Sequence, residues 1–223
     1  MDRRINKINE ACIAAERIIN MIESAGFDIA DPSSIINGEY RDFPDGMQYA
    51  YGASRLVVWD EDYCDFVVKI ALGSDCEKYC QHEVDIYQAA ERAGLEDKFA
   101  WCMCYSEPCI RENYYSPGIY VMEYVDCNED AVYDSAWKYG YKSFCEVKGY
   151  DSSSYEAADE YNEWNWSEDD DMVLDYMEAQ MDEETKRAFC VFMMKWNITD
   201  IHTANAGFKG NDMVIVDYAG WNW

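Results

Sequence analysis

Three polar residues near the C-terminal end have the types and spacing that phosphoryl-transfer chemistry needs. Asp200 follows an apolar helical segment, Asn205 comes five residues later, and Asp217 closes the apolar run MVIVD before Tyr-Ala-Gly. Asn205 and Asp217 carry oxygen ligands that suit Mg²⁺ held through nucleotide phosphates. Asp200 would then act as a base or orienting group. Each residue alone is typical of a turn, but all three at this spacing, each at the end of an element, indicate a site.

Two residues in the first half of the chain could complete this chemistry. Lys69 lies in the apolar run VVKIA, where a lysine is costly to bury unless it is paired. Glu83 lies in the segment QHEVDIYQAAERAG and could pair with Lys69 while the lysine binds phosphates. The alternatives are a lysine at a sheet edge that extends to water and a solvated Glu83, with Glu77 and Asp85 as rival partners.

The hydrophobic pattern predicts the elements that would position these residues. Apolar residues at three- and four-residue spacing predict a helix over 3–25 that ends near Gly26. Apolar runs separated by polar turns then predict, in chain order, strands 54–60 and 65–72, a helix over 75–93, and strands 98–106 and 118–125. We expect an antiparallel sheet with one helix packed on it.

The second half is predicted to be mostly helical. Residues 126–171 are rich in acids, Tyr and Trp and only weakly periodic, so no element is assigned from their pattern. Helices are predicted over 171–181 and 183–196, followed by a loop over 197–206 and a strand pair within 207–217. The fold class expected from both halves is α+β.

The composition favours a globular protein without a membrane anchor. The chain has 223 residues, of which 49% are hydrophobic, and no apolar run approaches the roughly 18 residues of a membrane span. The N-terminal helix lacks the apolar core of a signal peptide, so a cytoplasmic location is expected. Ten scattered cysteines and two histidines favour free thiols over a zinc site.

The net charge of −27 restricts the partners that we expect. It argues against direct binding of nucleic acid, which needs clustered Lys and Arg. It permits a basic protein partner or a surface that imitates nucleic acid. The simpler interpretation is a strongly solvated surface that keeps the protein in solution.

The five residues, taken in order, resemble the protein-kinase-like superfamily. VVKIA resembles its lysine strand, Glu83 the helix partner of that lysine, and MEYVD (122–126) the hinge between the lobes. DIHTAN resembles the catalytic loop D-x-x-x-x-N, and VDYAG resembles the metal-binding D-F-G motif. His202 is similar to the histidine of the aminoglycoside-phosphotransferase branch, whose loop reads D-[LI]-H-x-x-N.

This resemblance implies a fold, a cofactor and a set of site residues. It implies a two-lobe fold with an extra N-terminal helix (1–26), an N-lobe of sheet and helix (27–125) and a reduced, mostly helical C-lobe (126–223). The implied cofactors are ATP and Mg²⁺. The implied site residues are catalytic Asp200, Lys69 and Glu83, nucleotide-binding Lys69, Gly52, Ser54, Glu123 and His202, and metal-binding Asn205 and Asp217.

The sequence also departs from that family. Gly52-Ala53-Ser54 stands where a G-x-G-x-x-G loop is expected, and only six residues follow Asp217, so no helical platform for a peptide is expected. The leading hypothesis is a compact, atypical phosphotransferase that acts on a small molecule or a non-standard protein acceptor. The alternatives are a weak or inactive pseudokinase-like acidic protein that binds a basic partner, and a nucleotide sensor that transfers nothing.

Overall fold

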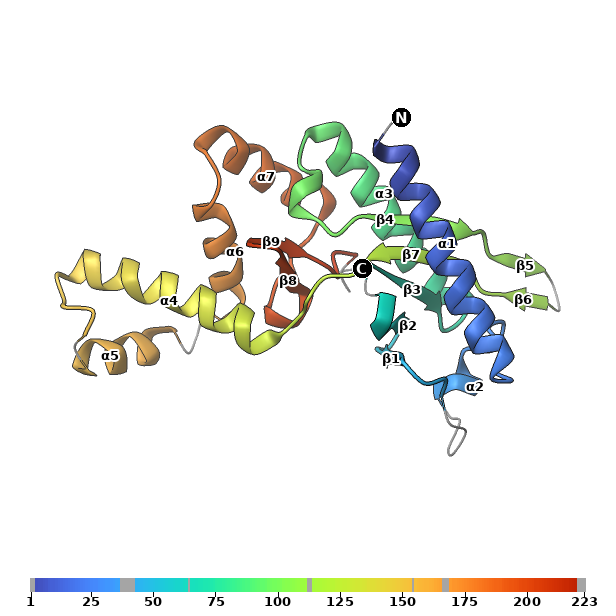
Figure 1. Cartoon of the computed structure of the whole chain (residues 1–223). Coiled ribbons are helices and arrows are strands. Elements are labelled where there is room, and N and C mark those ends of the chain that lie inside the picture. Colours follow the sequence, from blue (N-terminus) through green and yellow to red (C-terminus); the bar gives the residue numbers. More distant parts are fainter. Residues whose placement is uncertain are drawn as a thin grey trace. The chain divides into compact units, whose positions relative to one another are not determined.

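The computed structural model describes residues 3–36, 43–63, 65–111, 114–153, 155–165 and 169–219 (Figure 1). The chain divides into two compact units. The first unit is Met1–Gln88 with Ala100–Tyr124, and the second unit is Ala89–Phe99 with Val125–Trp223. Each unit has its own sheet, and helix α3 (Glu77–Ala93) begins in the first unit and ends in the second. Each unit is described separately below.

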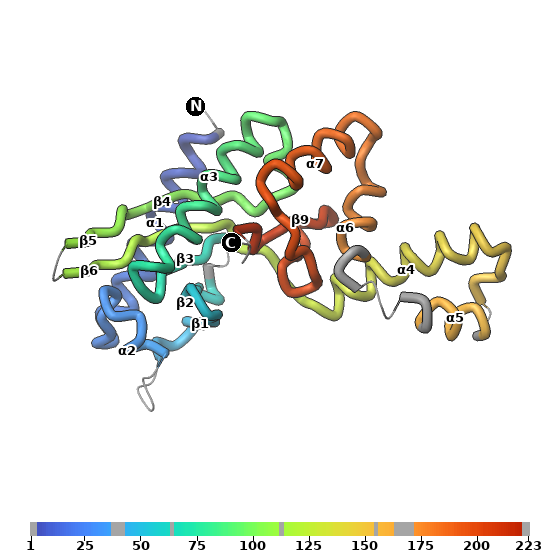
Figure 2. Tube along the Cα trace, turned by 180° about the vertical axis from the view of Figure 1, so that it is seen from behind, coloured from blue at the N-terminus to red at the C-terminus, as the bar shows by residue number. Residues whose placement is uncertain are grey.

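The first unit is built on a five-stranded antiparallel sheet in the order β1-β2-β3-β7-β4. Every residue of the central strand β3 is buried, because helices cover both faces of the sheet. The front and back views place α1 and α3 on opposite faces (Figures 1 and 2). The elements are β1 (Met47–Tyr51), β2 (Arg55–Asp60), β3 (Phe66–Ala71), α3 (Glu77–Ala93), β4 (Cys102–Ser106) and β7 (Ile119–Glu123).

Helix α1 (Arg3–Ser24) packs on β3 and β7 through a narrow apolar face. Ala11, Ala15, Ile18 and Ile22 are all buried, and their three- and four-residue spacing places them on one stripe of the helix. The helix predicted over 3–25 is confirmed. The hairpin of β2 and β3 and the helix after it are confirmed as well, and β2 pairs with β3 in antiparallel register.

A strand, a hairpin and a single helical turn of the first unit were not predicted. Strand β1 has one buried residue followed by four exposed ones, so the alternation that marks a half-buried strand is absent. The predicted turn 107–117 contains a second hairpin, and a single helical turn precedes β1. These elements are α2 (Ser33–Ile36), β5 (Cys109–Arg111) and β6 (Tyr114–Ser116).

Within the described residues, the second unit contains helices and a two-stranded sheet, so the predicted α+β fold class is confirmed. Helices α6 and α7 and the hairpin of β8 and β9 lie close to their predicted ranges. The elements are α4 (Glu129–Lys148), α5 (Tyr155–Asn165), α6 (Asp169–Ala179), α7 (Glu183–Trp196), β8 (Ala206–Lys209) and β9 (Asp212–Ile215).

Two helices, α4 and α5, occupy the segment to which no element was assigned. Asn128 caps α4 by accepting a hydrogen bond from the N–H of Ala131. Aromatic side chains supply much of the contact between α4 and α5, including Tyr141 and Tyr161, whose ring centroids are 5.6 Å apart. Large rings can bury much area from few positions, which explains the weak aliphatic periodicity.

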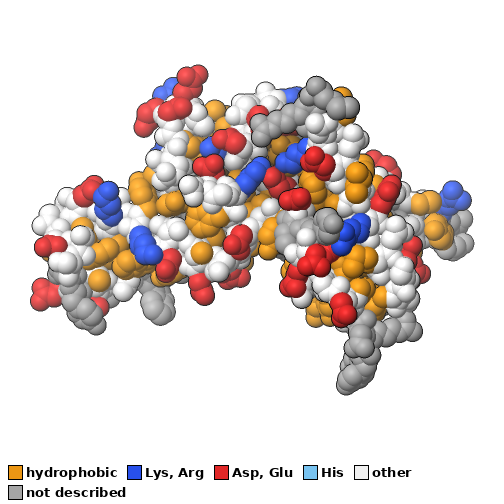
Figure 3. Space-filling model, viewed as in Figure 1, with side chains coloured by type: hydrophobic (Ala, Val, Ile, Leu, Met, Phe, Trp, Pro, Cys, Tyr) orange, Lys and Arg blue, Asp and Glu red, His pale blue; other side chains and the backbone are white. Residues whose placement is uncertain are grey.

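The surface is consistent with the acidic composition. Asp and Glu side chains are spread over the face seen in Figure 3, and few Lys or Arg side chains lie between them. Among the residues that the structure describes, no helix is both long and apolar enough to cross a membrane.

Candidate functional site

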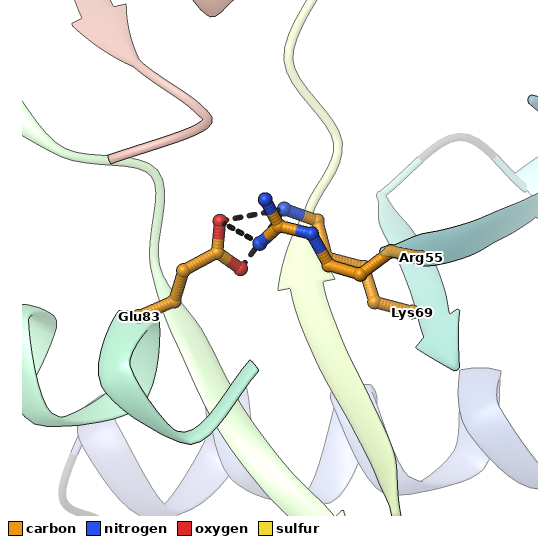
Figure 4. A network of polar contacts seen from close by, with 3 residues as sticks. All are labelled: Arg55, Lys69 and Glu83. Carbon is orange, nitrogen blue, oxygen red and sulfur yellow. Dashed lines mark hydrogen bonds and ion pairs between the residues drawn. The ribbon is translucent and has the colours of Figure 1, made fainter. Parts of the chain in front are cut away.

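The first unit holds a buried cluster of three charged side chains, Arg55, Lys69 and Glu83 (Figure 4). Nζ of Lys69 lies 3.0 Å from Oε2 and 3.2 Å from Oε1 of Glu83. Nη1 of Arg55 lies 2.6 Å from Oε1 of Glu83. The three side chains are 10%, 8% and 2% exposed in the order given. One buried carboxylate therefore binds two cations.

The local structure explains why Glu83 turns toward the sheet. Cys80, Glu83, Val84 and Tyr87 are all buried, and their spacing of i, i+3, i+4 and i+7 defines the inner face of α3. A carboxylate on such a face is costly unless it is paired, and Lys69 on β3 provides the partner. The pairing of Lys69 with Glu83 predicted from the sequence is present, while the catalytic roles of both residues stay predictions.

Glu77, one of the two rival partners for Lys69, is bonded elsewhere. Its carboxylate accepts hydrogen bonds from the hydroxyl of Tyr115 (2.7 Å), the N–H of Gly118 (2.7 Å) and the hydroxyl of Tyr120 (3.2 Å). Burial and then this carboxylate raise the pKa of the Tyr120 hydroxyl. The second rival, Asp85, accepts an exposed hydrogen bond from Gln81. Glu77 therefore fastens the start of α3 to the segment that leads into β7.

Sequence reasoning missed Arg55, which begins β2. The residue opens the run RLVVWD, and a charged residue ahead of an apolar strand carries no signal of its own. Its backbone is also engaged, because the N–H of Gly52 donates to the carbonyl of Arg55 at 3.0 Å. The carbonyl of Ser54 accepts from the N–H of Leu72 at 2.9 Å, and Ser54 is buried. Gly52 and Ser54, both predicted to bind nucleotide, thus form a tight and internally bonded turn.

Glu123, the predicted hinge residue, uses its side chain within the first unit. Its Oε2 accepts hydrogen bonds from Nζ of Lys7 at 3.0 Å and from the N–H of Trp101 at 3.3 Å. The N–H of Glu123 donates to the carbonyl of Trp101 at 2.8 Å. The carboxylate thus holds α1 and the start of β4 to the end of β7, and any role of Glu123 toward a nucleotide stays a prediction.

The second unit joins Asp200 and Asn205 in one hydrogen-bonded loop. Nδ2 of Asn205 donates to the carbonyl of Asp200 at 2.9 Å. The 3-10 turn Thr203–Asn205 follows His202, whose Nδ1 accepts from the N–H of Ala204 at 3.2 Å. This turn places Asn205 over the start of the loop, and the carboxylate of Asp200 remains 43% exposed. An exposed carboxylate in a fixed loop is accessible to an incoming hydroxyl group.

Asp217 is tied to the same loop through its neighbour in the chain. The N–H of Val216 donates to the carbonyl of Asn205 at 2.9 Å. On the other side of Asp217, the buried ring of Tyr218 packs edge-to-face on Phe99, with ring centroids 5.2 Å apart. The two anchors fix the backbone on both sides of Asp217. The second unit therefore brings the segments of all three predicted residues together.

The hydrogen-bond pattern decides which end of the Asn205 amide faces outward. Its NH₂ group is the donor toward the carbonyl of Asp200, so the amide oxygen is the end available as a ligand. An amide oxygen and the carboxylate of Asp217 are the types of oxygen ligand that Mg²⁺ prefers, and the role of Asn205 and Asp217 as metal ligands stays a prediction. In the described part of the chain, no three His, Cys, Asp or Glu side chains gather into a metal cluster.

His202 belongs to the internal structure of this loop. Its Nδ1 accepts from the N–H of Ala204, and its Nε2 lies 3.0 Å from Nδ2 of Asn205 and 3.6 Å from Oδ1 of Asp200. The ring therefore contacts both ends of the loop. The predicted contact of His202 with a nucleotide stays a prediction.

Comparison with known proteins gives only distant similarity. No protein-family profile and no curated protein sequence matches the chain. One solved structure with similarity is the GDP and kanamycin complex of APH(2")-IIia, at 12% identity and a TM-score of 0.38, over 84% of this chain and 72% of that one. Another is a GDP complex of a mutant aminoglycoside 2'-phosphotransferase-IIIa, at 12% identity and a TM-score of 0.39, over 86% and 72%. Similarity at this level does not assign the chain to a family.

Proposed function

We propose that this protein is a compact, kinase-like phosphotransferase that uses ATP and Mg²⁺. The observation that carries the proposal is the buried ion pair between Lys69 and Glu83. A lysine held on a strand by a helical carboxylate is poised to bind phosphate oxygens without being free to swing away. The loop that joins Asp200 to Asn205 in the second unit supports the same chemistry.

Each residue has a distinct role in this proposal. Lys69 binds the nucleotide phosphates, and Glu83 orients the lysine. Asn205 and Asp217 hold Mg²⁺, which neutralises charge on the phosphates when it is bound. Asp200 orients the acceptor hydroxyl and takes its proton, since phosphoryl transfer depends mainly on positioning and electrostatic stabilisation. Gly52, Ser54, Glu123 and His202 are proposed as further nucleotide contacts.

The acceptor is proposed to be a small molecule or a protein bound by other surfaces. The exposed carboxylate of Asp200 sets the chemical requirement, which is a hydroxyl group that can reach it.

The second candidate is a pseudokinase-like acidic protein that binds a basic partner. The net charge of −27 favours it, and so does the use of the Gly52 N–H inside its own turn. However, the acidic side chains are spread out on the face seen in Figure 3 rather than gathered into one patch. A spread of this kind is typical of a solvated surface.

Thermal melting with and without Mg-ATP tests the proposal, with Mg-GTP as a parallel arm. A ligand that binds the native state raises the melting temperature, so we expect an increase for the wild type and none for Asp217→Ala. Asp212→Ala is the matched control, because Asp212 is an exposed acid on β9 in the same unit, and it should respond like the wild type.

Each candidate function gives a different outcome. If neither nucleotide raises the melting temperature of the wild type, the phosphotransferase and the nucleotide sensor are both ruled out. A higher melting temperature without hydrolysis or transfer of the nucleotide's phosphate would favour the sensor. Binding of basic proteins that survives Asp200→Ala would favour the acidic binding protein.

A further inference from the structure

Strand β1 is one edge of the five-stranded sheet, and its hydrogen bonds show which backbone groups face outward (Figure 1). In the described part of the chain, β1 pairs with no strand other than β2. The N–H of Glu61 donates to the carbonyl of Gly46, directly before β1. Because every second residue of an antiparallel strand bonds to the same neighbour, the N–H and C=O groups of Tyr49 and Tyr51 point away from β2.

This edge lacks the features that usually prevent a sheet from pairing with another chain. Natural sheets protect an open edge with charged residues, proline or a bulge. Strand β1 has the sequence MQYAY, without a charge or a proline, and its register with β2 is continuous. The opposite edge strand, β4, has a register shift between Cys104 and Ser106. Of the two edges of this sheet, β1 is therefore the one suited to accept a further strand.

Aromatic rings lie along one face of this edge. The rings of Tyr49 and Tyr51 are stacked with centroids 6.5 Å apart, and the two residues are 38% and 58% exposed. Phe43 packs edge-to-face on Tyr49 at 5.1 Å and on the buried Phe27 at 5.6 Å, which anchors the row in the first unit. A strand added beside β1 would place alternate side chains next to the two tyrosine rings, whose faces attract cations.

The charges around β1 indicate what kind of chain would pair with it. Asp45 precedes the strand, Glu61 and Asp62 follow β2 beside it, and all three are exposed. Residues 43–54 contain no Lys or Arg. The net charge of −27 opposes pairing with a second copy of the chain. A strand that carries Arg or Lys would instead be attracted to this edge.

We propose that the open edge of β1 binds an extended, basic segment of another protein, which adds a strand to the sheet. Backbone hydrogen bonds to the outward groups of Tyr49 and Tyr51 supply affinity, and alternate Arg or Lys side chains beside the rings supply specificity. None of the residues proposed for phosphoryl transfer lies on β1, so this inference does not depend on the proposed function.

Fluorescence anisotropy with labelled nine-residue peptides tests the proposal at about 150 mM salt, where long-range attraction is screened. The probe peptide alternates Arg with Thr. A second peptide alternates Arg with Pro, which keeps the charge but cannot form a ladder, and a third alternates Glu with Thr. The protein variants are Tyr51→Ala and Tyr51→Pro, which removes an outward N–H. Tyr114→Ala is the matched control, because Tyr114 is 57% exposed on β6 in the same unit.

We expect the Arg-Thr peptide to bind the wild type about tenfold more tightly than the Arg-Pro peptide, since ladder hydrogen bonds are lost, and the Glu-Thr peptide not to bind. Tyr51→Ala should weaken binding of the Arg-Thr peptide about threefold, Tyr51→Pro should weaken it further, and Tyr114→Ala should leave it unchanged. If Tyr51→Pro misfolds by circular dichroism, the Arg-Pro peptide and Tyr51→Ala still decide.

Three results would overturn the proposal. The first is the absence of binding by the Arg-Thr peptide. The second is equal binding of the Arg-Thr and Arg-Pro peptides, or equal binding by the wild type and Tyr51→Ala, since charge alone would then explain the attraction. The third is a wild-type dimer in sedimentation that Tyr51→Ala converts to a monomer, because a second copy would then occupy the edge.

Discussion

Replacing Glu83 with Gln tests whether one carboxylate holds the buried cluster of the first unit together. The side chain is 2% exposed and binds Arg55 at 2.6 Å and Lys69 at 3.0 Å. Glutamine has nearly the same shape, so the change removes the negative charge with little change in packing. Two buried cations would then lose the carboxylate that they share. We therefore expect a large loss of stability from a nearly isosteric substitution.

The size of the loss follows from the burial of the cluster. Removing one partner of a buried ion pair destabilises a protein by about 3–5 kcal/mol. For a chain of this size, each kcal/mol lowers the melting temperature by about 2–4 °C. The expected decrease for Glu83→Gln is therefore about 6–20 °C.

Lys69→Met is the matched comparison, because it removes a cation and leaves Arg55 with Glu83 as a balanced pair. We expect it to cost less than Glu83→Gln, because Glu83 keeps Arg55 as a charged partner, whereas Glu83→Gln removes the carboxylate from two buried cations. The double variant that combines Glu83→Gln with Lys69→Met should be more stable than Glu83→Gln alone, because it removes one of the two buried cations. Urea unfolding followed by circular dichroism measures all three variants. A free energy of unfolding for Glu83→Gln within about 1 kcal/mol of the wild type would contradict the shared role of this carboxylate. A loss for Lys69→Met as large as that for Glu83→Gln would contradict it as well.

Three further predictions concern single side chains. Hydrogen bonds from the N–H groups of α7, foremost that of Thr185, hold the pKa of Asp182 below its usual 3.8. The stability that this cap contributes is therefore present above pH 3.8 and is lost as the pH falls further. The difference in melting temperature between the wild type and Asp182→Ala should therefore decrease in acid. A difference that stays constant with pH would contradict this prediction. Burial and then Glu83 raise the pKa of Cys80 to about 12, so iodoacetamide at pH 8 should label the exposed Cys127 well before Cys80, and equal labelling by mass spectrometry would be inconsistent. Glu77→Gln should lower the pKa of the Tyr120 hydroxyl, because a negative neighbour is lost; an unchanged tyrosine titration at 295 nm would argue against the contact.

The sequence predicted those parts of the site in which a charged residue interrupts an apolar pattern. Lys69 interrupts a strand whose residues are all buried, and a charge there requires a partner. Glu83 lies in the next helix, which packs on the same sheet. Asp200, Asn205 and Asp217 each follow or end an apolar element, and short loops return such residues to one end of a small unit.

The parts that were missed lacked such a pattern. Arg55 is the first residue of β2 and becomes significant only through the pairing of β2 with β3. Val57 lies opposite Lys69, and Arg55 is two residues from Val57 on the same face of the sheet, so the side chains of Arg55 and Lys69 reach one carboxylate. Helices α4 and α5 contact each other largely through aromatic side chains, and the spacing of aliphatic residues along the sequence does not reveal such contacts. Strand β1 is mostly exposed and is held by its backbone pairing with β2. Pairing register and ring packing are properties of the folded chain, and no short window of sequence contains them.

The central claim is that this chain transfers phosphate, and the most direct test measures ADP formed from Mg-ATP over time. Without its acceptor, a phosphotransferase transfers phosphate slowly to water, so the account predicts ADP above the buffer background for the wild type. The carboxylate of Asp200 orients the attacking hydroxyl in this account, so Asp200→Asn should fall to background while keeping its melting temperature. Wild-type protein at background, or Asp200→Asn as active as the wild type, would contradict the claim.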